Sequence, residues 1–180
     1  SVKVLGVDPG LERIGYGFVT REGSRLISGR FGLIETPRIA ISDRLLMLHE
    51  RLLALIDEEH PTVLATEKLF FSVNKRTAMD VAKAVGVILL AAAQRGLPWS
   101  ELTPPEIKLG VVGNGAADKK QVQFMVTRLL GLTETPKPDD VADALARVAR
   151  WFGELPAGPE PARAAFPLPP IAGRVVETVA

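Results

Sequence analysis

We predict an α/β fold for this chain of 180 residues, with a mixed sheet of five strands and helices on both faces. Three short apolar runs follow one another near the N-terminus, separated only by turn residues. Connections this short join antiparallel strands. Further along, two more short apolar runs alternate with segments whose apolar residues recur at helical spacing, a pattern typical of strand–helix–strand units.

The first three predicted strands form a meander. Residues 2–7 are a valine-rich apolar run that ends at an Asp-Pro-Gly turn, residues 8–10. Such a run followed by turn residues indicates a buried strand. Residues 14–20 and 26–34 are the next two strands, and a turn at residues 22–24 joins them.

The middle of the chain alternates helix and strand. Apolar residues at helical spacing predict a helix over residues 41–56. Residues 62–66 form the fourth strand, which leads into Glu67. An Ala- and Val-rich helix follows at residues 77–93, buried in the monomer or forming a dimer face, and the fifth strand at 99–102.

Helices complete the predicted domain. Pro104 and Pro105 begin one of them, at positions where a helix tolerates proline. Residues 118–130 and 139–152 form the next two, and we find no internal repeat.

A change in composition predicts a domain boundary near residue 155. The segment beyond it holds six of the 14 prolines, which neither continue a helix nor enter a sheet. We therefore expect a folded domain over residues 1–155 and a proline-rich tail over 156–180. Residues 174–179 are left open between a short added strand and a loose tail.

Composition narrows the chemistry. The chain contains no cysteine and only two histidines, which excludes disulfides, a thiolate nucleophile and cysteine-ligated metal. A bound metal would therefore depend mainly on carboxylates. The net charge of +1 indicates no polyanionic partner by itself, so contact with nucleic acid requires a local basic patch. Without a leader or a long apolar run we expect a cytoplasmic protein with no membrane partner.

Acidic residues fall where the predicted topology brings them together. Asp8 ends the first strand and Glu67 the fourth, and these strands are plausible neighbours in the sheet. At the start of the last helix, Asp140 and Asp143 share a face, as do Asp139 and Asp143. Carboxylates with almost no histidine suit Mg²⁺ or Mn²⁺. Two such ions about 4 Å apart promote phosphodiester hydrolysis.

Each acid also has a structural interpretation. Asp139 and Asp140 could simply cap the helix, because acids there favour the helix dipole. Asp8 could be an ordinary turn residue, and Glu67 could mark the end of a strand. Asp143 differs, because it lies among apolar residues where an unpaired carboxylate is costly.

Four segments, in this order, carry a family resemblance. They are Gly6-Val7-Asp8-Pro9-Gly10 with Gly15-Tyr16-Gly17; Thr66-Glu67-Lys68-Leu69-Phe70-Phe71; Ile107-Lys108 with Val112-Gly113-Asn114-Gly115 and Ala117-Asp118-Lys119-Lys120-Gln121-Val122-Gln123; and Asp140-Val141-Ala142-Asp143-Ala144-Leu145-Ala146. Through them the chain resembles the RuvC family of Holliday-junction resolvases, over residues 4–150.

The resemblance implies a ribonuclease-H-like fold and a homodimer that cuts four-way DNA junctions by paired, symmetric nicks in recombination and repair. It also implies dependence on Mg²⁺ or Mn²⁺, two ions per site, and a branch-migration helicase complex as a partner. By resemblance Asp8, Glu67, Asp140 and Asp143 are the catalytic, metal-binding acids. Because Asp139 and Asp140 are adjacent, the third acid is left open between them.

The resemblance also suggests residues that bind DNA. Lys108, Lys119 and Lys120 would contact phosphates, and Arg76 would extend the same patch. Phe70 would stack on an unpaired base at the junction centre. The alternative for each cation is ordinary solvated surface.

Two other functions remain open at this point. One is a related nuclease that acts on RNA–DNA hybrids. The other is a junction-binding module whose acids are structural. We expect Trp99 and Trp151 to be packing residues.

Overall fold

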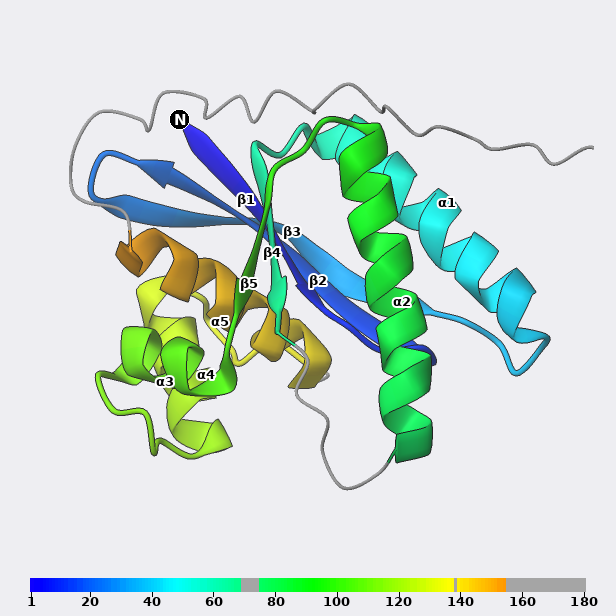
Figure 1. Cartoon of the computed structure of the whole chain (residues 1–180). Coiled ribbons are helices and arrows are strands. Elements are labelled where there is room, and N and C mark those ends of the chain that lie inside the picture. Colours follow the sequence, from blue (N-terminus) through cyan, green and yellow to red (C-terminus); the bar gives the residue numbers. More distant parts are fainter. Residues whose placement is uncertain (69–74, 138, 155–180) are drawn as a thin grey trace, which may run out of the picture.

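The computed structural model describes residues 1–68, 75–137 and 139–154, and gives only the backbone of residues 75–77 and 150–154. Its elements confirm the predicted order of strands and helices (Figure 1). They are β1 (Val2–Asp8), β2 (Arg13–Glu22), β3 (Arg25–Glu35), α1 (Ile41–Glu59), β4 (Val63–Glu67), α2 (Lys75–Gln94), β5 (Trp99–Leu102), α3 (Pro104–Val112), α4 (Lys119–Leu129) and α5 (Asp139–Glu154).

One mixed sheet forms the centre of the domain, with the strand order β3-β2-β1-β4-β5. β1, β2 and β3 pair antiparallel, as expected of a meander. β4 pairs parallel to β1, and β5 parallel to β4. The predicted α/β class is confirmed, and the first and fourth strands are neighbours.

Helices cover both faces of the sheet and form two cores. α1 and α2 lie on one face, whereas α3, α4 and α5 lie on the other (Figure 1). Because side chains alternate along a strand, β1 contributes to both cores. Leu5 packs with Leu64 and Ile88 on the side of α1 and α2, whereas Val4 belongs to the core that contains Leu145 of α5. No helix in the described part of the chain has the length and apolar character that a membrane crossing requires.

Two capping boxes fix where α3 and α4 begin. The side chain of Thr103 accepts a hydrogen bond from the backbone of Glu106, whose carboxylate accepts one from the backbone of Thr103. Asp118 and Gln121 make the same reciprocal pair at α4. Such caps satisfy backbone donors that a helix start leaves free. They therefore set the positions of Lys108, in the second turn of α3, and of Lys119 and Lys120, in the first turn of α4.

The prediction that Trp99 is a packing residue is wrong, because its side chain is half exposed. Trp99 begins β5 at the edge of the sheet, and it lies on the face opposite to buried Leu102. The side chain of Trp151 lies outside the described residues.

Glycines in the sheet allow α5 to lie unusually close to it. A Cβ at Gly15 would overlap the backbone of Asp140, and one at Gly6 would overlap the carbonyl oxygen of Ala144. Backbone atoms in a helix do not move aside easily, so any larger residue would push α5 away. These glycines therefore hold the start of α5 directly over β1 and β2.

This packing predicts the effect of Gly15→Ala. The added methyl group would meet the backbone of Asp140, so we expect a loss of about 2–3 kcal/mol in the free energy of unfolding. Thermal or urea unfolding measures the change. Gly115→Ala is the matched control, since only the carbonyl oxygen of Pro105, at 3.8 Å, lies near its Cβ. Equal stability of the two variants would contradict this account of the close packing.

Candidate active site

The parallel pairing of β1 and β4 brings two acids to one edge of the sheet. Gly6 pairs with Ala65 across these strands, and Gly6 faces Ala144 of α5. Two residues further along, Asp8 ends β1 and Glu67 ends β4. Because residues two apart share a face, both carboxylates lie side by side and face α5.

The close approach of α5 adds further charged residues to this edge. Gly15 pairs with Asp8 across β1 and β2, and Gly15 also lies against the backbone of Asp140. The first turn of α5 therefore starts directly beside the end of β1. Asp140, Asp143 and Arg147 follow one another at spacings of three and four, so they share one face of the helix.

The acids at this edge are close enough to influence one another's charge. Burial raises the pKa of Asp8 from 3.8 to about 6, and Arg147 partly opposes this rise. The negative charges of Asp143, Glu67 and Asp140 raise it further, in that order. A carboxyl group with such a pKa lacks enough nearby positive charge to offset burial and like-charge repulsion. The cluster would therefore be stabilised by an added cation.

Arg147 is the closest cation to the two acids of the sheet. One nitrogen of its guanidinium, Nη2, donates to Oδ1 of Asp8 at 2.8 Å and also to Oε2 of Glu67. Its side chain is only 4% exposed. Burial of this charge is tolerated because it is paired with two carboxylates.

The remaining acids also have cationic partners. Lys119 contacts Asp143 and Asp139, each at 3.2 Å. Burial tends to lower the pKa of Lys119, but the charge of Asp143 and the hydrogen bonds to both acids raise it overall. Arg13, from β2, contacts Asp140 at 3.0 Å.

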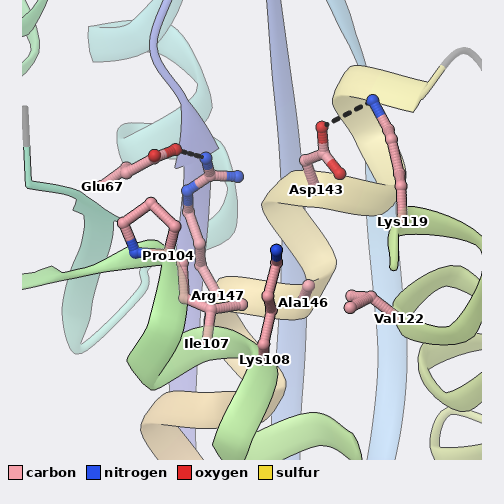
Figure 2. A pocket seen from close by; sticks show the side chains of 9 residues that line it. All are labelled: Glu67, Pro104, Ile107, Lys108, Lys119, Val122, Asp143, Ala146 and Arg147. Atoms are coloured by element: carbon pink, nitrogen blue, oxygen red, sulfur yellow. Dashed lines mark hydrogen bonds and ion pairs between the residues drawn. The ribbon is translucent and has the colours of Figure 1, made fainter. Parts of the chain in front are cut away.

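A pocket of about 290 Å³ opens beside these residues. Figure 2 shows Arg147 pointing toward Glu67 and Lys119 toward Asp143, with the end of Lys108 in the same space. The lining combines acids with cations and a few apolar side chains. It is formed by Glu67, Pro104, Ile107, Lys108, Lys119, Val122, Asp143, Ala146 and Arg147.

The structure distinguishes the two adjacent aspartates at the start of α5. Asp140 is 30% exposed and close enough to influence the pKa of Asp8. Asp139 is 64% exposed, and it accepts hydrogen bonds from Lys119 and Gln123, which lower its pKa. Asp139 therefore lies on the outer side of the helix start, and Asp140 lies with the cluster.

The predicted DNA-binding residues fall into three groups. Lys108 and Lys119 line the pocket, on α3 and α4 respectively. Lys120 is exposed next to Lys119 and does not line the pocket. Phe70 lies outside the described residues, and of Arg76 only the backbone is described.

Sequence analysis missed Arg147 and Arg13. Arg147 lies one helical turn after Asp143, in a helix stretch that is otherwise mostly Ala, Val and Leu. That spacing, on a face expected to be buried, was a signal that could have identified it. Arg13 offered no such signal, since an arginine at the start of a strand is ordinary.

The donor set suits a hard divalent cation. All four side chains supply carboxylate oxygens, and the high pKa of Asp8 reflects its burial together with the negative charges of the neighbouring acids. In the described residues, no three His, Cys, Asp or Glu side chains converge closely enough to hold an ion. Instead each acid is paired with a cation of the chain. Ion binding would therefore require some of these pairs to separate.

A mixed sheet of this order, with carboxylates at the ends of β1 and β4 and on the helix that crosses them, belongs to the ribonuclease-H-like class of folds. Comparison with known proteins narrows the class. The family model described as crossover junction endodeoxyribonuclease RuvC matches residues 4–149. The chain belongs to the RuvC family.

Relatives and solved structures agree with this assignment. The chain is 50% identical over 144 residues to the crossover junction endodeoxyribonuclease RuvC of Desulfitobacterium hafniense. The aligned part covers 79% of this chain and 87% of the relative. The RuvC structure from Thermus thermophilus has a TM-score of 0.79 at 32% identity, covering 84% of this chain and 94% of that one. RuvC from T. thermophilus in complex with a Holliday junction substrate has a TM-score of 0.77 at 29% identity, covering 85% and 94%.

The raised pKa of Asp8 predicts a pH-dependent effect of Asp8→Asn in EDTA. Between pH 3.8 and about 6 the folded state binds the Asp8 proton more tightly than the unfolded state does. The parent therefore loses stability as pH rises through this window, by about 3 kcal/mol in total, whereas Asp8→Asn does not. We expect the Tm of the variant, relative to the parent, to rise from pH 4 to pH 7 in a calorimetric series.

Asp57→Asn provides a control of opposite sign. The hydrogen bond from Arg95 lowers the pKa of the exposed Asp57. Replacing Asp57 should therefore lower the free energy of unfolding more at neutral than at acid pH. A flat profile for Asp8→Asn would show that the Asp8 pKa is not raised.

Proposed function

We propose that the protein resolves four-way DNA junctions by divalent-metal-dependent hydrolysis of one phosphodiester in each of two opposed strands. Membership of the RuvC family makes it an endodeoxyribonuclease. The observation that carries the proposal is that Asp8, Glu67, Asp140 and Asp143 lie near one another at one edge of the sheet, each beside a cation of the chain and next to a pocket lined by lysines.

These four acids are the proposed metal ligands and catalytic residues. The donors are suited to Mg²⁺ or Mn²⁺, with two ions in each site. Bound ions would supply activation of a water molecule and stabilisation of the charge that develops on the phosphate. The chain's own contribution is to hold the acids on a rigid sheet edge and one helix face, where their mutual repulsion favours a cation.

The lysines are the proposed phosphate contacts. Lys108 points into the pocket, and Lys119 lies at its border in contact with Asp143 (Figure 2). Lys119 is half exposed, so its side chain can move from a carboxylate to a phosphate. Contacts to phosphates position the backbone of DNA without reading its sequence. Lys120 and Arg76 would extend this surface, and Phe70 would stack on an unpaired base.

We propose a homodimer, since a junction cut in two opposed strands calls for two equivalent sites. On α2, Met79, Lys83, Gly86 and Leu90 are exposed at spacings of three and four, so they form a stripe along one face. Small and apolar residues on this stripe suit close packing against a second copy.

The proposed setting is DNA recombination and repair, with a branch-migration helicase complex as a partner. The proposed nuclease domain covers residues 1–155, in line with the family match over residues 4–149. The proline-rich residues 156–180 would then be an appended tail.

A plasmid that extrudes a cruciform tests the proposal, because paired nicks across the junction linearise it and single nicks only relax it. We expect linear product with Mg²⁺ or Mn²⁺ and none with EDTA. Asp8→Asn should reduce the rate at least about 100-fold while junction binding persists. Asp57→Asn, which alters an exposed acid outside the cluster, should cut at the parental rate.

Other products would assign the protein differently. Cleavage of an RNA–DNA hybrid in preference to a junction would indicate another ribonuclease-H-like nuclease. Junction binding without cutting under any metal would leave a binding module. Nicked circles without linear product would contradict the paired action of a dimer.

A pair of variants identifies the third acid. Asp140→Asn should lower the nicking rate at least about 100-fold, because Asp140 lies with the cluster. Asp139→Asn should change the rate only a few-fold, since Asp139 lies on the outer side of the helix start. Single-turnover cleavage of a labelled junction measures both rates. The reverse order would make Asp139 the ligand.

A further inference from the structure

The guanidinium of Arg147 lies between the two sheet acids, Asp8 and Glu67, which are proposed metal ligands. A single nitrogen, Nη2, donates to both Asp8 and Glu67, which belong to neighbouring parallel strands. Asp8 and Glu67 would hold a cation through their carboxylate oxygens, and the guanidinium already occupies one oxygen of each. A buried positive charge at this place repels a second cation, so the two would compete for the same carboxylates.

Arg147 differs from the other cations of the cluster in its burial. The side chains of Arg13 and Lys119 are 48% and 52% exposed, so both can turn toward solvent or a phosphate. Arg147 is almost fully buried. Its Nε–H is also buried and finds no acceptor among the described residues. An unsatisfied buried donor is costly, so the attraction of Asp8 and Glu67 must hold the guanidinium in place.

We propose that Arg147 is an internal counterion that competes with the metal for Asp8 and Glu67. Its single positive charge partly offsets the charges of the two carboxylates and keeps them together. Metal binding then requires the guanidinium to release these oxygens. The apparent metal affinity is the intrinsic affinity multiplied by the fraction of molecules in which Arg147 has released the two carboxylates. Arg147 is thus a positioning residue that sets the metal concentration at which the site fills.

The inference rests on the proposed function, because it takes Asp8 and Glu67 as metal ligands. Its test therefore measures metal binding and stability of the full chain without DNA. Mn²⁺ is titrated calorimetrically into the parent, Arg147→Met and Arg147→Gln, and Tm is measured in EDTA and in saturating Mn²⁺. Arg95→Met is the matched control, since Arg95 also pairs with a carboxylate, Asp57, but on the exposed surface.

We expect both neutral variants to bind Mn²⁺ about tenfold more tightly than the parent. In EDTA, the Tm of Arg147→Met should fall by about 5 °C or more, because two partly buried acids lose their partner. Saturating Mn²⁺ should then raise its Tm by more than it raises that of the parent. Arg95→Met should bind Mn²⁺ as the parent does.

Arg147→Gln decides the question if Arg147→Met does not fold, since the glutamine amide keeps N–H donors without the charge. Unchanged or weaker Mn²⁺ binding in the neutral variants would overturn the inference, because Arg147 would then only orient the acids. If neither the parent nor the neutral variants bind Mn²⁺, the proposed metal site itself would be overturned. Comparison of the parent with the variants therefore separates the two failures.

Discussion

The whole site depends on how closely α5 lies against β1 and β2. At Gly6 and Gly15 the backbone of the helix takes the space that a side chain would fill. A wider separation would still allow an apolar core, because Val141, Leu145 and Val148 could pack against larger neighbours. It would not bring Asp140 and Asp143 to the ends of β1 and β4. Close packing here therefore serves the chemistry of the site more than the stability of the core.

Repulsion among the acids is the second constraint, and it opposes the close approach of α5 to the sheet. Bringing four carboxylates together in a partly buried place raises the free energy of the folded state. The chain offsets this by supplying cations from three different elements: β2, α4 and α5. Two of these cations are half exposed and can change partners, whereas Arg147 is buried and has little freedom. The site is thus a set of ion pairs in which the acids still outnumber the cations.

Much of this could be predicted from the sequence, for physical reasons that differ between elements. Short connections and alternating apolar runs fixed the meander and the neighbouring positions of β1 and β4, and hence the adjacency of Asp8 and Glu67. Helical spacing placed Asp140 and Asp143 on one face. Arg147 was missed because arginine is usually exposed, and its burial depends on a tertiary contact. Trp99 was mispredicted as a packing residue because tryptophan is usually well buried. Periodicity in the sequence does not reveal which face of an edge strand stays uncovered.

The order of these elements along the chain has a consequence for synthesis. The hydrogen bonds of Arg147 join residues 139 and 80 positions apart, to Asp8 and Glu67 respectively. A ribosome-bound chain whose strands have emerged carries Asp8 and Glu67 but neither the acids nor the arginine of α5. Such a chain holds only two of the four proposed metal ligands. The proposed site of this nuclease is therefore complete only after its last helix has docked.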